Sequence, residues 1–320
     1  NLGLLLLDSG ETDEAIVHLS KAVELSPNRY GIYRNLADAY AKKMNYETAL
    51  SYYQQSLAIA SMANDPEGTK QLHLRIGNTL EKMGKAEKAL DHYKQALSLD
   101  PSSDAAHNGL GKVYAAQGMY AEAARHFSEA IRINRNYGEA YNNLANIFKQ
   151  QGRVSEAVLY YNKSLQADPS SPVAYYNLAN ILRETGDEMG AERHYTLALR
   201  ADPNYVNAHA NLASLYYNKG DLNQAIAHLQ EVVRIMPDDN MAKENLAKAL
   251  DRRKDIHLDI IKVQRILTSE PDNLRALHRL GELYRMDGNY SHAIDQLMKV
   301  IQLRPDHPDG YYNLACLYSL

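Results

Sequence analysis

Four asparagines recur at one spacing along the chain, and their side chains are of a type that can hold a peptide backbone. They are Asn143, Asn177, Asn211 and Asn245, each 34 residues after the one before. A carboxamide offers a donor and an acceptor, so it can pair with a peptide N–H and C=O together. Asparagine is also a poor residue for the middle of a helix. We expect this asparagine ladder to bind an extended peptide backbone.

Further amide and aromatic side chains lie near the ladder in the sequence. Asn35 holds the same place in an earlier segment of the chain. We expect the same binding site to include Asn142, Asn146, Tyr176, Asn180 and Tyr217. The alternative interpretation is that these asparagines bond to neighbouring helices, or are simply common in this class of repeat.

Histidine also recurs at one spacing, which argues against a metal site. The shared position holds His18, His92, His126, His194 and His228. Residues at the same place in neighbouring helix pairs lie about 10 Å apart, whereas zinc ligands lie within about 2.0–2.3 Å of one ion. We therefore expect half-buried rings between helices, and neither a metal ion nor another cofactor.

No catalytic constellation can be argued from the sequence. The spacing gives no Ser-His-Asp or Cys-His arrangement, and Gly109 and Gly111 fall inside a predicted helix rather than in a phosphate-binding loop. The single cysteine, Cys316, excludes an intrachain disulfide and a thiolate-rich zinc site. We expect that this chain is not itself an enzyme.

Charge and composition narrow the class of partner. The net charge of −4 provides no general attraction for nucleic acid or for an anionic membrane. The apolar runs are too short to span a bilayer. A chain with one cysteine and no secretory signal favours a reducing compartment. We expect a cytoplasmic protein whose partner is another protein or a peptide.

A 34-residue period organises the whole chain. Prolines mark it at Pro101, Pro169, Pro203, Pro237, Pro271 and Pro305. Whole repeats begin at Tyr30, Lys70, Asp104, Gly138, Pro172, Val206, Asn240 and Leu274. We expect a single array over residues 1–320. It comprises a partial repeat (1–29), a 40-residue repeat with an insertion (30–69), seven 34-residue repeats (70–307) and a partial repeat (308–320), and is a fragment of a longer polypeptide.

The residue types within each repeat predict two antiparallel helices. Counted from the first residue of the repeat, the seventh is leucine or isoleucine, the eighth is small and the eleventh is large. This spacing is one face of a helix. A second set, at the twentieth, twenty-fourth and twenty-seventh positions, predicts a second helix, usually after a turn with a glycine such as Gly84 or Gly118. The fold class is therefore all-α.

This pattern resembles the tetratricopeptide repeat (TPR), whose signature is W-x₂-L-G-x₂-Y, then A-x₃-F, then P. The resemblance covers the whole chain and implies a right-handed α-solenoid, a superhelix of antiparallel helix pairs whose first helices line a concave groove. It also implies binding of extended peptides or partner helices. The segments from Asn142 to Asn146 and from Tyr176 to Asn180 look like the TPR groove of O-linked N-acetylglucosamine transferases, where asparagines at this place hold the substrate backbone.

Two repeats depart from the pattern. The 40-residue repeat carries its extra residues around Ser61–Thr69, and we expect longer helices and a longer loop there. In the repeat from Asn240 to Asn273, Asp259 replaces the alanine at the twentieth position and Lys254 replaces the turn glycine. Because a carboxylate is costly to bury, we expect a loosened or rotated second helix.

Our leading interpretation is a protein-interaction scaffold with a peptide-binding groove. One alternative is the substrate-recruiting arm of a larger enzyme, such as a glycosyltransferase whose catalytic domain lies outside this chain. Another is self-association through open ends of the solenoid, where an apolar stripe such as that of Leu314 and Ala315 faces outward.

Overall fold

The computed structural model describes residues 2–306 and 308–318, and within them it contains helices and no strands. Packing divides the chain into two bodies, residues 1–169 and residues 170–320. The N-terminal body contains α1 (Leu2–Ser9), α2 (Thr12–Leu25), α3 (Tyr30–Lys42), α4 (Tyr46–Met62), α5 (Pro66–Lys82), α6 (Ala86–Leu99), α7 (Asp104–Ala116), α8 (Tyr120–Ile133), α9 (Gly138–Gln150) and α10 (Val154–Ala167). The C-terminal body contains α11 (Pro172–Glu184), α12 (Glu188–Ala201), α13 (Val206–Lys219), α14 (Leu222–Ile235), α15 (Asn240–Ser269), α16 (Leu274–Met286), α17 (Tyr290–Leu303) and α18 (Pro308–Tyr318).

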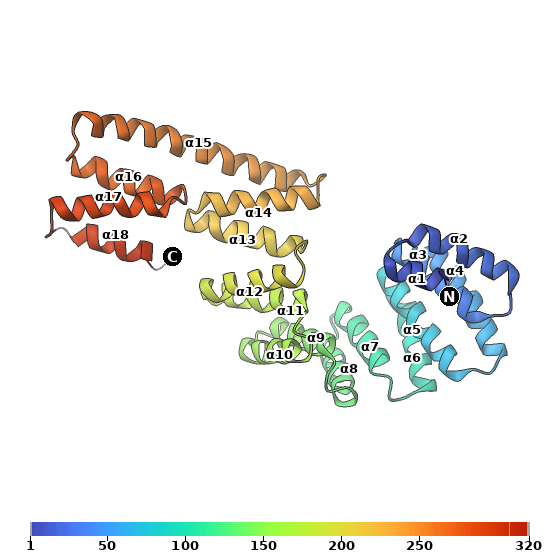
Figure 1. The fold of residues 1–320 in the computed structure, drawn as a ribbon. Helices are drawn as coiled ribbons and strands as arrows, with labels where there is room; N and C mark the ends of the chain where they lie inside the picture. Colours follow the sequence, from blue (N-terminus) through green and yellow to red (C-terminus); the bar gives the residue numbers. More distant parts are fainter. Residues whose placement is uncertain (1, 307, 319–320) are drawn as a thin grey trace. The chain divides into compact units, whose positions relative to one another are not determined.

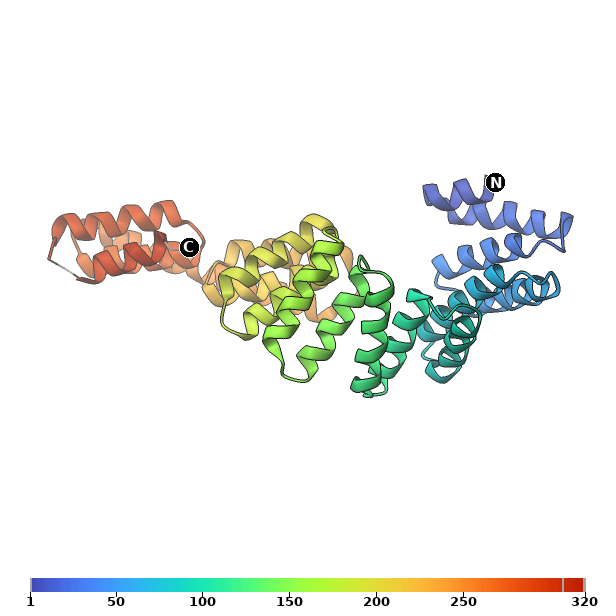
Figure 2. The ribbon, with the colours of Figure 1, turned by 90° about the horizontal axis from the view of Figure 1, so that it is seen from below.

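Most repeats form one pair of helices. The tightest packing joins the first helix of a repeat to its second, as in α3 with α4, α5 with α6 and α13 with α14. Figures 1 and 2 show the chain running back and forth through these pairs within each body. The all-α solenoid architecture predicted from the sequence is confirmed.

The pair of α7 and α8 shows why the sequence folds in this way. The side chain of Ser103 accepts a hydrogen bond from the amide of Ala106 at 3.3 Å and caps the start of α7. Gly118 ends the helix with a φ of +74°, which glycine adopts without strain. Phe127 of α8 lies so close to Gly111 that an added Cβ would be 2.5 Å from its ring. The small residue at the eighth position therefore sets the distance between the two helices.

The extra residues of the 40-residue repeat lengthen its last helix and the helix that follows. Helices α4 and α5 have 17 residues each, whereas α3 and α6 have 13 and 14. The side chain of Asp65 caps α5 by accepting from the amide of Gly68 at 2.9 Å, and Pro66 opens the helix. Because these residues start α5 early, only three residues connect the helices. The longer helices are found, and the expected longer loop is wrong.

The repeat from Asn240 to Asn273 is not a helix pair. Its residues form one continuous helix, α15, of 30 residues, so the expectation of a loosened or rotated second helix is wrong. Other whole repeats turn at a residue with positive φ, usually a glycine, and Lys254 holds that place here inside the helix. Nothing in this stretch favours a left-handed turn. The carboxylate of Asp259 is not buried in α15, since its side chain is 43% exposed and pairs with Lys262 at 2.8 Å.

The continuous helix brings together two turns that lie two repeats apart in the sequence. Figure 1 shows α14 and α16 along different parts of α15, and residues of all three helices share one apolar cluster. The hydroxyl of Tyr290 donates to Oδ2 of Asp221 at 2.7 Å. Oδ1 of Asp221 accepts from the amide of Gln224 at 3.0 Å. The carboxylate is only 7% exposed, and these two bonds compensate for its burial.

The substitution Y290F tests this contact between turns. It leaves the buried Asp221 without one of its donors, so we expect the C-terminal body to lose about 1–3 kcal/mol of unfolding free energy. Urea denaturation followed by circular dichroism measures the loss. The matched control is Y120F, since Tyr120 holds the same position in its own repeat, is 36% exposed and makes no hydroxyl hydrogen bond within the described residues. Equal midpoints for the two variants would contradict the contact.

Candidate functional site

A buried tyrosine is paired with a polar side chain in four repeats. The tyrosine hydroxyl at the twenty-fourth position donates to the side-chain oxygen at the ninth position of the same repeat. We call this contact the tyrosine link; its pairs, at 2.5–2.6 Å, are Tyr53–Asp38, Tyr93–Asn78, Tyr161–Asn146 and Tyr195–Asn180. The tyrosines are at most 3% exposed, so each hydroxyl needs an internal acceptor. Asn146 and Asn180, predicted as site residues, thus also serve the core.

Two asparagines of the ladder bond to the preceding repeat. Nδ2 of Asn211 donates to Oδ1 of Asn180 at 2.9 Å and to the hydroxyl of Tyr195 at 3.1 Å. Nδ2 of Asn143 donates to Oδ1 of Asn108 at 3.0 Å. Within the described residues the carboxamide oxygens of Asn143 and Asn211 accept no hydrogen bond. Each amide therefore keeps its acceptor for a peptide N–H, while its donor is used by the fold.

The other predicted residues differ in exposure. Asn142 is buried, with 7% of its surface exposed. Asn35 is half-buried and accepts from the neighbouring Arg34 at 3.4 Å. Asn177 is half-buried and already takes part in an interaction with another group of the chain. Tyr176 packs against two tyrosine rings, with centroid separations of 5.8 and 5.4 Å. These side chains offer a ligand less surface than Asn245 does.

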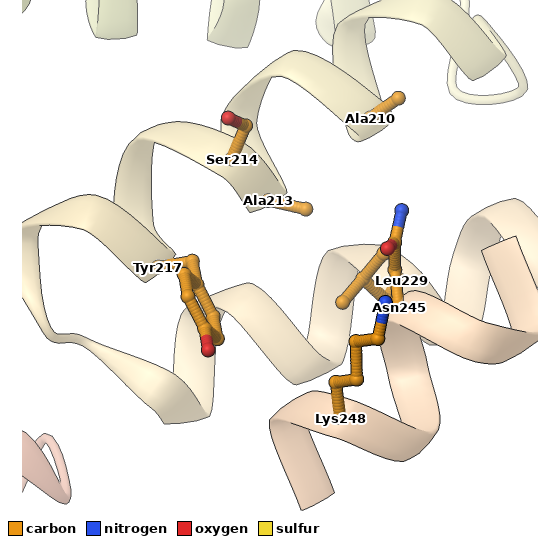
Figure 3. Close-up of a pocket in the computed structure, with 7 residues that line it drawn as sticks. All are labelled: Ala210, Ala213, Ser214, Tyr217, Leu229, Asn245 and Lys248. Atoms are coloured by element: carbon orange, nitrogen blue, oxygen red, sulfur yellow. The ribbon is translucent and has the colours of Figure 1, made fainter. Parts of the chain in front are cut away.

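Asn245 is exposed and lies on the wall of a hollow of about 240 Å³ in the C-terminal body (Figure 3). The hollow is lined by Ala210, Ala213, Ser214, Tyr217, Leu229, Asn245 and Lys248. Figure 3 shows side chains of α13 on one side and those of α15 on the other. The amide of Asn245 makes no hydrogen bond to the described residues, so both its donor and its acceptor are available. The structure thus brings together two predicted residues, Tyr217 and Asn245.

The hollow exists where the tyrosine link is missing. In this repeat Leu229 occupies the twenty-fourth position and Ser214 the ninth. Both side chains are shorter than the tyrosine and asparagine of the linked repeats, so the space that those fill is open. The sequence carries this signal, because repeats with tyrosine at the twenty-fourth position have asparagine or aspartate at the ninth, and repeats with another residue there do not.

The rim of this hollow is cationic. The guanidinium of Arg252 lies over the ring of Tyr217, 5.0 Å from its centroid. The ammonium of Lys248 pairs with Glu244 at 2.7 Å, in a contact that is well exposed to solvent. Apolar walls beneath a polar, cationic rim suit an apolar side chain carried on a backbone with exposed C=O groups.

Two hollows in the N-terminal body have a more polar lining. Their volumes are about 230 and 340 Å³, and both include Asn78 and Lys82. In the larger one, Asp38 accepts from the hydroxyl of Tyr53 at 2.5 Å and from Arg75 at 2.7 Å. Burial raises the pKa of Asp38, and the positive charge of Arg75 opposes that rise. These contacts are internal ion pairs and hydrogen bonds, so this region offers a ligand fewer available groups.

Three histidine pairs lie inside repeats, which the comparison of like positions in the sequence missed. The residue at the fourth position of the repeat, on the first helix, faces the residue at the twenty-third position, on the second helix. The Nδ1–Nδ1 distances are 2.9 Å for His73–His92, 3.0 Å for His107–His126 and 2.9 Å for His209–His228. Other repeats place Tyr33–Tyr52 and Tyr141–Tyr160 there. Comparing the fourth with the twenty-third position of the same repeat would have found the pairs.

Burial keeps one member of each pair neutral. It lowers the pKa of His73, His126 and His228 to about 4 in each case. The nearby partner imidazole lowers these pKa values further, because a second positive charge at this distance is unfavourable. His73, His126 and His228 are therefore uncharged imidazoles at neutral pH.

Family models match most of the chain. The model described as "Cilia and flagella-associated protein 70 C-terminal domain", a TPR model, matches residues 32–231. Three further TPR models match residues 3–43, 210–257 and 274–307. Together they match stretches of both bodies, and the match to residues 210–257 includes the first part of α15.

Curated relatives match shorter stretches. Small glutamine-rich tetratricopeptide repeat-containing protein 2 of Mycosarcoma maydis is 29% identical over 96 residues, which is 30% of this chain and 26% of the relative. Protein O-mannosyl-transferase TMTC1 of Mus musculus is 28% identical over 112 residues, 35% of this chain and 12% of the relative. Hsp70-Hsp90 organizing protein of Triticum aestivum is 29% identical over 108 residues, which is 34% of this chain and 18% of the relative. The matches thus span about a quarter or less of each relative.

Two solved structures share the fold. The structure titled for pilF of Pseudomonas aeruginosa has a TM-score of 0.54 and 20% identity, covering 69% of this chain and 97% of that one. The Cut9-Hcn1 hetero-tetramer structure has a TM-score of 0.54 and 17% identity, covering 95% of this chain and 58% of that one.

In the described part of the chain, no helix combines the length and the apolar character that crossing a bilayer requires.

The substitutions N180A and N245A separate amides that serve the fold from amides that face solvent. N180A leaves the buried hydroxyl of Tyr195 without its acceptor, so we expect a loss of about 1–3 kcal/mol of unfolding free energy. N245A removes an exposed side chain and should change stability by about 0.5 kcal/mol or less. Urea denaturation of both variants measures the difference. A loss in N245A as large as that in N180A would contradict this division.

The histidine pairs predict a loss of stability in acid. The pKa of His228 falls from 6.5 to about 4 on folding, so the unfolded chain binds the proton more tightly. The stability that this group contributes is complete above pH 6.5 and declines as the pH falls toward 4. The variant H209Y/H228Y should therefore show a shallower fall in melting temperature between these pH values than the unsubstituted chain. H18Y, at an exposed histidine, is the control, and unchanged steepness in the double variant would contradict the prediction.

Proposed function

The chain is a tetratricopeptide repeat protein and belongs to the family of the cilia and flagella-associated protein 70 C-terminal domain, and from that premise we propose that it is a protein-interaction scaffold that binds an extended peptide. Helix-pair repeats present long rows of first-helix side chains, which suit an extended ligand better than a compact one. The site proposed is the hollow between α13, α14 and α15.

One observation carries this proposal: the hollow opens beside an asparagine with an unused amide. The walls from Ala213, Leu229 and Tyr217 accept an apolar side chain of the peptide. The amide of Asn245 then pairs with the N–H and C=O groups next to that side chain. The carboxamide oxygen of Asn211, on the first helix of the preceding repeat, accepts a further backbone N–H. The peptide is thus anchored by one side chain and held along its backbone.

The ladder contributes in two ways under this proposal. Asn211 and Asn143 hold neighbouring repeats together through Nδ2 and offer only their oxygens to a ligand. Asn245 offers its whole amide. Backbone recognition at these three positions needs no matching set of specificity pockets. The specificity of the site then comes from the hollow and its cationic rim.

The curated relatives support a role in protein interactions. The Triticum aestivum relative is named as an organizing protein of Hsp70 and Hsp90, and the Mycosarcoma maydis relative is named only for its composition and repeats. Each matches about a third of this chain. Their names support the class of function and leave the ligand of this chain to experiment.

The variant S214N/L229Y tests the peptide site. It introduces the asparagine and tyrosine of the tyrosine link, which three other repeats accommodate, and so fills the hollow while keeping the helix pair. Peptides are first selected from a displayed random library against the unsubstituted chain. We expect S214N/L229Y to weaken their binding at least about tenfold, equal to about 1.4 kcal/mol. Fluorescence anisotropy with labelled peptides measures the dissociation constant, and N245A should also weaken it.

The control for this experiment is Q230A, which removes an exposed amide from α14. It should bind the selected peptides as the unsubstituted chain does. Circular dichroism establishes that S214N/L229Y is folded. Full binding by folded S214N/L229Y, or equal weakening by Q230A, would contradict the hollow as the site.

A second candidate function is the substrate-recruiting arm of a glycosyltransferase. The match to a protein named as an O-mannosyl-transferase favours it. The bound peptide would then be an acceptor substrate. Sugar attached to a serine or threonine of the captured natural ligand would distinguish this candidate from a scaffold.

A further inference from the structure

Hydrogen bonds fix the tautomers of two of the histidine pairs. Nε2 of His209 lies 3.1 Å from the carbonyl oxygen of Pro203. A carbonyl can only accept, so this nitrogen carries the proton and Nδ1 of the neutral ring carries the lone pair. The Nδ1–H of His228 must then donate to it. The pair of His107 and His126 repeats this arrangement, with Nε2 of His107 lying 3.4 Å from the carbonyl of Pro101.

We propose that each of the three histidine pairs is a binding site for one divalent transition-metal ion, Ni²⁺ or Cu²⁺. Both imidazoles would bind through Nδ1. The Nδ1 lone pair of His209 accepts from Nδ1–H of His228 in the free chain. It becomes available to the ion, together with a lone pair on Nδ1 of His228, once the proton of His228 moves to Nε2 through water. This shift exchanges one neutral tautomer for the other, so both rings stay neutral and no net proton is released from them.

The separation of the nitrogens in the hydrogen-bonded pair is close to that of two adjacent metal ligands. Imidazole nitrogens bind such metals at about 2.0–2.1 Å, and two nitrogens 2.9–3.0 Å apart then subtend an angle of about 90° at the metal. Adjacent ligands at a right angle belong to square-planar and octahedral coordination, which Cu²⁺ and Ni²⁺ adopt. A tetrahedral Zn²⁺ ion would require the two nitrogens to be about 3.4 Å apart.

In two of the pairs, a backbone carbonyl already orients one of the imidazole rings. A metal-binding histidine usually donates its other ring N–H to a carbonyl or carboxylate, which fixes its orientation. His107 and His209 do so to Pro101 and Pro203. A carboxylate also acts on one ring of each pair through its charge, namely Asp91 on His92, Glu129 on His126 and Glu231 on His228. These negative charges favour a cation, while Arg125 near His126 opposes one.

Each site supplies two protein ligands. The described part of the chain contains no group of three or more histidine, cysteine, aspartate or glutamate residues arranged to hold an ion. Water must fill the remaining positions, and the half-exposed rings of His92, His126 and His228 give it access. A two-histidine site of this kind links the two helices of one repeat, so binding should stabilise the fold.

Isothermal titration with NiCl₂ on the untagged, metal-stripped chain tests the proposal. The unsubstituted chain should bind about three ions, and H209Y/H228Y should bind one fewer. Replacing all three pairs by tyrosine should remove all three. The melting temperature of the unsubstituted chain should rise with Ni²⁺ concentration, and the triple-pair variant should not respond. Spectra of bound Cu²⁺ by electron paramagnetic resonance should show two nitrogen ligands per ion.

The chain provides its own matched design for these variants. Tyrosine pairs already occupy these positions at Tyr33–Tyr52 and Tyr141–Tyr160, so the fold accommodates them. The single variant H209Y is the safeguard, because it places a tyrosine opposite His228 as Tyr175 already faces His194. It too should lose one ion. An unchanged number of ions in folded H209Y or H209Y/H228Y, or no binding by the unsubstituted chain, would overturn the proposal and leave the pairs as hydrogen-bonded neutral rings.

Discussion

The buried hydroxyl of the tyrosine at the twenty-fourth position is the constraint on which much of this structure depends. Its ring packs between helices so tightly that Gly77 and Gly109 have no room for a Cβ, which would lie 2.6 and 2.5 Å from Tyr93. Its hydroxyl must then find an acceptor in the core. The ninth position of the same repeat supplies it. In a linked repeat, the polar side chain at the ninth position is therefore already hydrogen-bonded to a buried tyrosine and is less available to a ligand.

The hollow beside Asn245 follows from the absence of this constraint in its repeat. With Leu229 and Ser214 in place of the linked pair, the repeat loses both a large ring and the need for an internal acceptor, and a hollow opens. The absence of a turn at Lys254 acts on the same region, because it makes α15 continuous and places Asn245 and Lys248 on a helix with no second helix of its own. Two local departures from the repeat pattern therefore shape one site.

The helix pairs could be predicted from the sequence because their causes are local. Spacing, small residues and turn glycines each act within one repeat, as Gly111, Phe127 and Gly118 illustrate. The roles of Asn146 and Asn180 could not be predicted from the sequence. An asparagine that accepts a hydrogen bond from a buried tyrosine cannot be told from one that faces a ligand by its position in the repeat. The histidine pairs were missed because like positions were compared across repeats, when the partner of His228 was His209 in its own repeat.

Pairs of positions, rather than single positions, carry the chemistry of this chain. The ninth residue depends on the twenty-fourth, and the fourth on the twenty-third, since each pair spans the two helices of one repeat. A pair can change from tyrosine and tyrosine to histidine and histidine, as from Tyr141–Tyr160 to His209–His228, while the flanking leucines and alanines preserve the packing. Because the helices are held by those small and apolar residues, the paired positions are free to differ between repeats. One backbone unit can therefore provide a packed core in one repeat, an open hollow in another and two facing imidazoles in a third.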